Sequence, residues 1–272
     1  MIAPPAIADR DLQAVIDLVY ERSGIALHAG KRALVTARLQ KLVRAGGFAT
    51  FADYLAGVKR DRSGEALDAL LDAITTNHTS FFREPQHFEF LVSRVAALRG
   101  GIDVWSAGCA TGEEPYSLAM ALADARPDLA ERGDVRILAS DLSGSALARA
   151  RAGVYPIDRV RDVPDEARRR HLEKGLGAQA GLARVRPHLR RMVRFERLNL
   201  LDIDHLGRAF DVIFCRNVMI YFDQRVQQRV VGMLERHLAP GGYLFVAHAE
   251  SLTGLAHGLR AVAPAVYTRR PA

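Results

Sequence analysis

Apolar residues near the start of the chain recur at the spacing of one helical face. Between Asp9 and Arg22 they fall at Leu12, Val15, Ile16 and Val19, and Gly24 ends the run. Lys31 to Ala45 predicts a second helix, in which Leu34, Val35, Leu39 and Leu42 are expected to pack. Further helices are expected from about Phe51 and from Ser63, which suits an N-cap, to about Ile74. The pattern therefore predicts a small all-helical unit.

After Gly101 the pattern changes to short apolar runs that alternate with amphipathic helices. The expected strands are 102–107, 135–140, 211–215 and 242–248, with Leu238–Gly242 as a turn and Ala265–Arg270 as an edge strand. Such alternation predicts a parallel sheet with helices on both faces, in which Trp105 belongs to the core. Ligands of these sheets bind beyond the C-terminal ends of the strands.

The first strand runs into a glycine-bracketed turn, VWSAGCATGEEPYS, over Val104–Ser117. Gly108 and Gly112 allow the backbone to turn sharply and to approach a ligand, and Pro115 suits the first turn of a helix. The spacing departs from that of dinucleotide sites, and two glutamates stand where a pyrophosphate needs bare N–H groups. S-adenosylmethionine, which carries a sulfonium, an ammonium and ribose hydroxyls, fits this turn better than NAD. An ordinary strand-to-helix turn is the alternative.

Three other segments place polar groups near the same edge of the sheet. Asp141 follows the second strand, where it either binds ribose hydroxyls or caps the next helix, and Ser143 is free to act as the cap. The strand in FDVIFCRNVMIYF ends at Arg216 and Asn217, with Tyr221 one helical turn later. TTNHTSFFREP, residues 75–85, contributes Arg83. A cation and a phenol are thus directed toward one site.

Composition is ordinary for a globular protein, with 49% hydrophobic and 25% charged residues among 272, but the net charge of +7 is uneven. Residues 22–62 and 159–197 each carry +7, which leaves −7 on the remainder. Two basic segments on an acidic body predict acidic partners. Nucleic acid is a rival partner, disfavoured because few aromatic residues interleave the basic stretches.

Several classes of protein are disfavoured by what the sequence lacks. No stretch approaches a transmembrane span, and MIAPPAIADR has no basic and apolar segments typical of a secretory signal. Cys109 and Cys215 stand in apolar or glycine-rich settings that predict free thiols in a reducing cytoplasm. No Cys/His spacing indicates zinc, so no metal is expected. His78, His87 and His248 are interpreted as packing or hydrogen-bonding residues rather than catalysts.

Six segments occur in the order found in the chemotaxis receptor glutamate methyltransferases, the CheR family. They are TTNHTSFFRE, VWSAGCATGEEPYSLA, ASDLS, ARAGVYP, FDVIFCRNVMIYFD and LAPGGYLFVAHAES. The chain resembles this family over almost its whole length. The resemblance implies an α/β fold of the class I, Rossmann-like S-adenosylmethionine-dependent methyltransferase type over residues 101–272. It also implies a small antiparallel β subdomain inserted within about 153–198. Before residue 101 it implies a helical receptor-contacting domain over 1–75, followed by a linker and helix over 76–100 that contribute to the cofactor site.

The resemblance also implies a function and the residues that perform it. The implied reaction methylates glutamate carboxylates on cytoplasmic domains of bacterial chemoreceptors, with S-adenosylhomocysteine as the product. The family's cofactor contacts fall on Asn77, Thr79, Arg83, Glu114, Asp141, Asn199, Leu200, Arg216 and Asn217. Arg83 and Tyr221 match residues that orient the substrate. The basic helix that contacts the receptor maps onto Arg38, Lys41 and Arg44.

Two details of the resemblance are weaker, and two other functions compete. KGLGAQAGLARVR, from Lys174, resembles the loop with which some members grip a receptor's C-terminal peptide, mostly in glycine placement. AHAES departs from the GHSE of many relatives. A nucleic-acid methyltransferase is disfavoured because CRNVMIYF lacks the Asn/Asp-Pro-Pro-aromatic element of amine-methylating enzymes. A silent receptor-binding adaptor is disfavoured because every matched pocket position holds a suitable residue. Neither nucleic-acid binding nor membrane insertion is expected.

Overall fold

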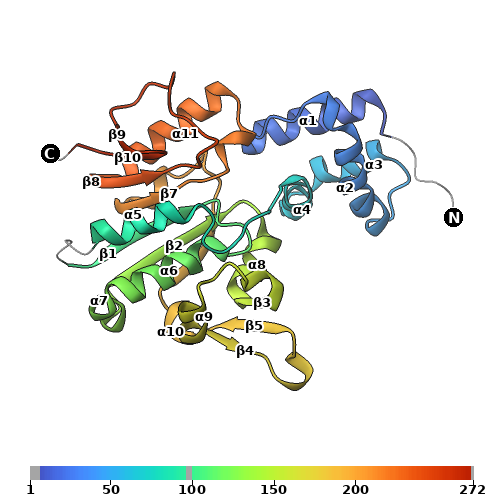
Figure 1. The fold of residues 1–272 in the computed structure, drawn as a ribbon. Coiled ribbons are helices and arrows are strands. Elements are labelled where there is room, and N and C mark those ends of the chain that lie inside the picture. The colour runs from blue at the N-terminus through green and yellow to red at the C-terminus, as the bar shows by residue number, and fades with distance from the viewer. Residues whose placement is uncertain (1–6, 96–99, 271–272) are drawn as a thin grey trace.

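The computed structural model describes residues 7–95 and 100–270 (Figure 1). The first six residues lie outside the described residues. They are the start of the predicted helical domain and include much of the stretch that lacks the features of a secretory signal. Residues 96–99 of the predicted linker and helix, and residues 271–272, also lie outside the described residues. Within the described part, no helix is both long enough and apolar enough to cross a membrane.

Four helices form the N-terminal unit, as the apolar spacing predicts. They are α1 (Asp9–Ser23), α2 (Arg32–Ala45), α3 (Phe51–Arg60) and α4 (Glu65–Ile74), and a short 3-10 turn, η1 (Ala29–Lys31), leads into α2. Val15, Val35 and Leu70 are fully buried in their shared core. Two local predictions are wrong. Gly64, not Ser63, occupies the N-cap of α4, and Leu34 remains 39% exposed because it points away from that core.

The second unit contains a seven-stranded sheet in the order β6-β2-β1-β7-β8-β10-β9. Its strands are β1 (Ile102–Ala107), β2 (Val135–Asp141), β6 (Val193–Arg197), β7 (Phe210–Phe214), β8 (Leu238–Phe245), β9 (Arg260–Ala263) and β10 (Val266–Thr268). The pairings among β6, β2, β1, β7 and β8 are parallel, but β10 pairs antiparallel with both β8 and β9. The prediction of a wholly parallel sheet is therefore wrong for its last two strands.

Three other features of the sheet also differ from the prediction. Leu238–Gly242 is not a turn but the first part of β8, because its residues already pair with β7 and with the C-terminal segment. β10 lies inside the sheet, and the edge belongs to β9, which the pattern did not reveal. β6, with the mixed sequence VRFER, was also not predicted.

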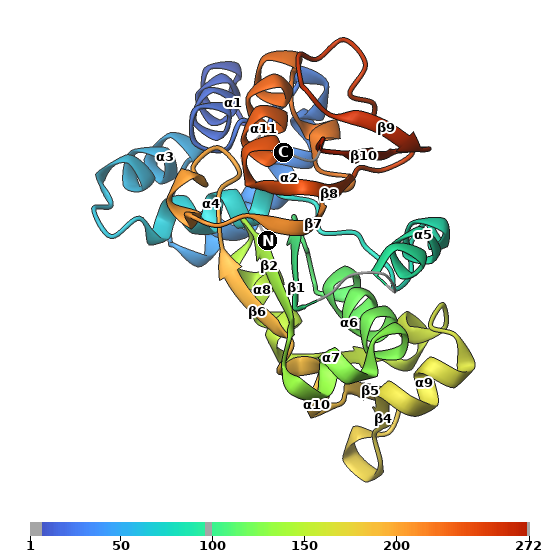
Figure 2. The ribbon, with the colours of Figure 1, turned by 90° about the vertical axis from the view of Figure 1, so that its left-hand side faces the viewer.

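Helices cover both faces of the sheet, as expected (Figure 2). α5 (Pro85–Val95), α6 (Glu113–Ala125), α7 (Pro127–Arg132) and α8 (Gly144–Ala152) pack on one face, and α11 (Gln224–His237) packs on the other. Because strand residues alternate between faces, Val104 joins the first core and the adjacent Trp105 joins the second. Trp105 is fully buried, and its indole N–H donates to Ser140 Oγ at 2.9 Å.

A small antiparallel sheet, β3-β5-β4, projects from the end of the molecule opposite the N-terminal helices (Figure 1). It comprises β3 (Val154–Pro156), β4 (Leu172–Lys174) and β5 (Leu182–Val185), with the short helices η2 (Ile157–Val160), α9 (Asp165–His171), η3 (Gly177–Gln179) and α10 (Pro187–Arg190) between or beside them. This insertion completes the expected α/β architecture with a helical N-terminal unit and a small antiparallel subdomain.

Specific polar contacts hold the helical unit against the C-terminal ends of the strands. Arg197, at the end of β6, pairs with Asp68 of α4 through its two terminal nitrogens, Nη1 and Nη2. Asn199 Nδ2 donates to the carbonyl of Arg22 at 2.7 Å. After α1, Ala26 N donates to the carbonyl of Tyr221 at 2.8 Å, beside an isolated bridge between Ile25 and Phe222. The helical unit thus forms part of the wall above the sheet edge.

Gly112 at the start of α6 provides a test of this packing. Its φ is 95°, and an added Cβ would lie 2.8 Å from both Ala150 Cβ and Tyr155 Oη. Gly133 has a φ of 76° but open space around it, so it is the matched control. We expect Gly133→Ala to lower the free energy of unfolding by about 1 kcal/mol, and Gly112→Ala by about 2 to 5 kcal/mol, because overlap adds to backbone strain. Equal losses on urea denaturation would contradict this account.

Candidate functional site

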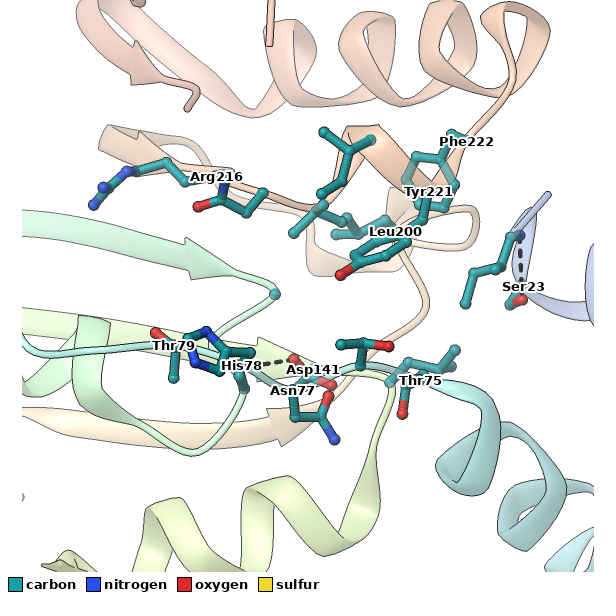
Figure 3. A pocket seen from close by; sticks show the side chains of 18 of the residues that line it. Ser23, Thr75, Asn77, His78, Thr79, Asp141, Leu200, Arg216, Tyr221 and Phe222 are labelled. Carbon is teal, nitrogen blue, oxygen red and sulfur yellow. Dashed lines mark hydrogen bonds between the residues drawn. The ribbon is translucent and has the colours of Figure 1, made fainter. Parts of the chain in front are cut away.

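A cavity of about 560 Å³ opens beyond the C-terminal ends of β1, β2 and β7 (Figure 3). Its floor is formed by the turns after these strands, and its sides by the segment 74–80 and by residues 23–34 of the helical unit. All nine residues predicted to bind the cofactor, together with Tyr221, line it: Asn77, Thr79, Arg83, Glu114, Asp141, Asn199, Leu200, Arg216, Asn217 and Tyr221. The fold therefore brings five separated segments to one site.

The two glutamates at the start of α6 face different surroundings. Glu114 lines the cavity, where its Oε1 accepts from Ser106 Oγ at 2.7 Å and its Oε2 lies 3.4 Å from Arg216 Nη1. Burial raises the pKa of the Glu114 carboxyl, against the opposing effect of Arg216. Glu113 turns away from the cavity. It is 1% exposed and is paired with Arg159 of η2, so only one glutamate of the pair faces a ligand.

Asp141 closes the other side of the glycine turn. Its Oδ2 accepts from Ala110 N and its Oδ1 from Ser143 N, each at 2.8 Å. Burial raises the pKa of Asp141, while these backbone N–H groups act to lower it. Each carboxylate oxygen retains a second lone pair, which suits a ribose hydroxyl. Ser143 acts as the predicted cap of α8, accepting from Ala146 N at 3.1 Å.

Arg216 is the buried cation of the site, with a side chain only 2% exposed. Its guanidinium lies 3.0 Å from Glu84 Oε2 and 3.4 Å from Glu114 Oε2, and it also donates to the carbonyl of Arg83. Glu84 was not predicted from the sequence. A buried charge must be neutralised and hydrogen-bonded, so Arg216 ties the end of β7 to α6 and to the segment before α5. Figure 3 shows its side chain directed away from Tyr221.

Two histidines lie beside the Glu84 carboxylate of this ion pair. His87 is buried, and its Nδ1 lies 3.4 Å from Glu84 Oε2, whereas His248 Nδ1 lies 4.0 Å from Glu84 Oε1. Burial, with help from Arg216, lowers the pKa of His87 to about 4, so the ring is neutral at pH 7. Glu84, His87 and His248 offer potential metal ligands within 4.8 Å of one another. However, Arg216 already neutralises Glu84 and opposes a second cation there.

Glu250 is a second residue that sequence reasoning missed. Its Oε2 accepts from Asn217 N at 2.9 Å and from Ala247 N at 2.8 Å, and its Oε1 accepts from Ile220 N at 3.3 Å. Asn217 has a φ of 58°, a left-handed conformation that asparagine tolerates better than most residues with a side chain. Glu250 thus holds the turn from Arg216 to Tyr221 in place. Its sequence signal was the glutamate of AHAES, a segment that carries the family resemblance but to which no site role was assigned.

Arg83 and Tyr221 supply groups that remain available to a ligand. Both line the cavity, and within residues 7–95 and 100–270 neither the guanidinium of Arg83 nor the hydroxyl of Tyr221 makes a hydrogen bond or ion pair. Figure 3 shows the phenol projecting into the space in front of Thr75 and Asp141. By contrast, the amide of Asn77 donates to Ser143 Oγ at 3.1 Å, and that of Asn199 is held by α1, so both stabilise the walls.

The three basic residues assigned to α2 do not line the cavity. Arg38 is half-buried and donates to the carbonyl of Thr75 at 3.0 Å and to Thr76 Oγ1 at 3.1 Å, so it ties α2 to the start of the linker. Lys41 and Arg44 are exposed, and in the part of the chain that the structure describes neither forms an ion pair. Of the three, Lys41 and Arg44 thus present their charges to solvent, whereas Arg38 does not.

Known proteins resemble the chain over both units. The family model described as "CheR methyltransferase, all-alpha domain" matches residues 10–75, and that described as "CheR methyltransferase, SAM binding domain" matches residues 77–267. The chemotaxis protein methyltransferase of Klebsiella aerogenes is 41% identical over 91% of this chain and 85% of its own length. Those of Borreliella burgdorferi and Salmonella typhimurium are 36% and 38% identical, over 97% and 92% of this chain and 95% and 86% of their own lengths.

Glu250→Gln tests whether a carboxylate is needed to hold the Arg216–Tyr221 turn. An amide offers only one acceptor oxygen, so an NH₂ group must face a backbone N–H whichever way the side chain is placed. We expect S-adenosylhomocysteine to bind about tenfold or more weakly by calorimetry, in line with about 1–3 kcal/mol for an unsatisfied buried group. Glu235→Gln is the control, since Glu235 accepts from a single backbone N–H, that of Gly258. Unchanged affinity in both variants would show that the Glu250 carboxylate is not needed to hold this turn for ligand binding.

Proposed function

This chain belongs to the CheR methyltransferase family, and we propose that it methylates glutamate side chains on the cytoplasmic domains of chemoreceptors, using S-adenosylmethionine. The methyl esters formed would serve chemotactic adaptation, in the cytoplasm. Family membership supports a methyltransferase that acts in chemotaxis and binds S-adenosylmethionine. The observation that carries the choice of substrate is the unpaired Arg83 guanidinium, because it shares one cavity with the carboxylates of Glu114 and Asp141.

The buried carboxylates fit the cofactor. Glu114 and Asp141 both have pKa values raised by burial, and a positively charged ligand offsets that desolvation. We assign Asp141 to the ribose hydroxyls and Glu114 to the cationic end, with Asn77, Thr79, Asn199, Leu200 and Asn217 shaping the walls. When bound, S-adenosylmethionine supplies a methyl group activated by its sulfonium.

The acceptor needs no general base. A glutamate carboxylate, with an ordinary pKa of about 4.3, is already ionised at pH 7. One of its oxygens forms the new bond to the methyl carbon as the carbon–sulfur bond breaks, and S-adenosylhomocysteine leaves. Arg83 binds the carboxylate and Tyr221 donates a hydrogen bond, so that one oxygen is aligned with the methyl group. Alignment in a site screened from water supplies the rate enhancement.

Outside the cavity, the acidic receptor surface is proposed to contact Lys41 and Arg44. Arg38 acts indirectly in this scheme, since its guanidinium fixes α2 to the linker. A C-terminal receptor peptide, if the receptor carries one, is proposed to add to the β3-β5-β4 sheet, beside the exposed Leu176. This tether is separate from the chemistry, so its loss would leave the reaction itself intact.

The deciding experiment measures transfer of labelled methyl from S-adenosylmethionine to a receptor cytoplasmic fragment, followed by mild alkali. Label released as methanol is expected, because glutamyl esters are base-labile. Alkali-stable label, or label on added RNA or DNA, would instead indicate amine or nucleic-acid methylation. Absence of label despite cofactor binding would indicate either a silent adaptor or the wrong receptor.

Arg83→Ala should lower kcat/KM for the receptor fragment by about 10- to 100-fold, which corresponds to losing a charge-assisted hydrogen bond of about 1.5–3 kcal/mol. Arg94→Ala is the matched control, because Arg94 also lies on this part of the chain but stacks on Phe90 outside the cavity. Initial rates at varied concentrations of the receptor fragment give kcat/KM for each of the two variants. If the two variants turn over equally, Arg83 does not hold the acceptor.

Affinity for S-adenosylhomocysteine should fall as the pH is lowered from 8 to 5. The pKa values of Glu114 and Asp141 are raised, so these groups take up protons at a higher pH than ordinary carboxyls do. The ligand's ammonium group and ribose hydroxyls favour the ionised forms, and protonation therefore weakens binding. Asp141→Asn should bind weakly at pH 8 and show a flatter profile by calorimetry. A pH-independent affinity in the unmodified protein would refute the assignment.

A further inference from the structure

Two large apolar side chains at the cavity are exposed rather than buried. Leu34 on α2 is 39% exposed, and Ile220 on η5 (Met219–Tyr221) is 52% exposed. Both line the cavity, and neither belongs to the residues assigned to the cofactor. On α2 the core is filled by Val35 and Leu39, so Leu34 contributes little to folding of the helical unit. Because both side chains line one cavity instead of lying singly on the outer surface, a partner that enters the cavity can cover them.

The two side chains come from different units, but their backbones are joined. The chain between α1 and α2 hydrogen-bonds to the segment around Tyr221 through Ala26 N and the Tyr221 carbonyl, at 2.8 Å. Ile25 and Phe222 form a bridge beside it. Glu250 holds Ile220 N from the other side. Leu34 and Ile220, which we term the apolar lip, therefore line one cavity from two units whose adjoining segments are hydrogen-bonded to each other.

Charge around the apolar lip indicates what covers it. Lys31, at the end of η1, and Arg83 line the same cavity, and neither side chain has an acidic partner among the residues that the structure describes. Lys41 and Arg44 add exposed positive charge farther along α2. A segment that carries only carboxylates would leave Leu34 and Ile220 in water. The complementary occupant is an acidic protein segment with an apolar side chain beside its acceptor glutamate.

We propose that the apolar lip selects acceptor glutamates that have an apolar side chain on the same face of the receptor segment. The inference rests on the proposed function, because it names a preference among its substrates. If the segment is helical, the selecting side chain stands three or four residues from the glutamate, since these positions share a face. Arg83 then holds the carboxylate while the apolar lip positions the segment, so specificity and chemistry use different contacts.

The test is a double-mutant cycle between enzyme and substrate. Leu34→Gln and Ile220→Gln should each raise KM for the receptor fragment about tenfold, as expected for the loss of about 1.4 kcal/mol of apolar burial. Neither kcat nor the affinity for S-adenosylhomocysteine should change. Val262→Gln is the matched control, because Val262 is 36% exposed on β9 and does not line this cavity. Its KM should equal that of the unmodified protein.

The substrate arm replaces the apolar residues three and four positions from the acceptor glutamate by serine. This fragment should bind poorly to the unmodified enzyme, and the lip variants should then cause little further loss, because interacting groups are not additive. Additive losses, an unchanged KM, or an equal loss of cofactor affinity would each overturn the proposal. If the unmodified enzyme produces no base-labile label, the proposed function itself fails. If base-labile label forms but the KM of the lip variants is unchanged, the role of the apolar lip is refuted and the proposed function stands.

Discussion

The ion pair that joins Arg216 to Glu84 and Glu114 is the interaction on which the rest of the site depends. A guanidinium with 2% exposure is tolerated only where carboxylates and carbonyls surround it. Because Glu84 precedes α5 and Glu114 lies on α6, the pair fixes the linker and the glycine turn relative to the end of β7. Removing Arg216 would leave the charges of Glu84 and Glu114 uncompensated. A variant at Arg216 would therefore change both the cavity and the stability of the fold.

The walls above that pair are built by the same principle, in which carboxylates accept backbone N–H groups. Asp141 shapes the glycine turn through Ala110, and Glu250 stabilises the left-handed Asn217. These hydrogen bonds fix the conformation of turns that lie outside the helices and strands. The helical unit then closes the cavity by hydrogen bonds of its own, chiefly that of Ala26 to Tyr221. Residues of both units consequently line the cavity.

How much of this the sequence predicts depends on how local each feature is. β1, β2 and α1–α4 were predicted because their apolar spacing is complete within each segment. β6 and β9 have no such run and exist because neighbours pair with them. The exposure of Leu34 was missed because helical spacing identifies a face but not where the core ends. Glu84 and Glu250 were missed because the Arg216 and Asn217 groups that they bind are more than 30 residues away.

The glutamate pair at the start of α6 shows why motif and geometry must be combined. Consecutive residues on a helix point about 100° apart, so two adjacent glutamates cannot both face one small ligand. Glu114 faces the cavity, whereas Glu113 binds Arg159, which also donates to the carbonyl of Thr79 at 3.0 Å. Tyr155 Oη donates to the carbonyl of Thr111 in the same turn at 2.8 Å. Of the two adjacent glutamates, Glu114 therefore faces the cavity, whereas Glu113 helps to fix the small β sheet to the glycine turn.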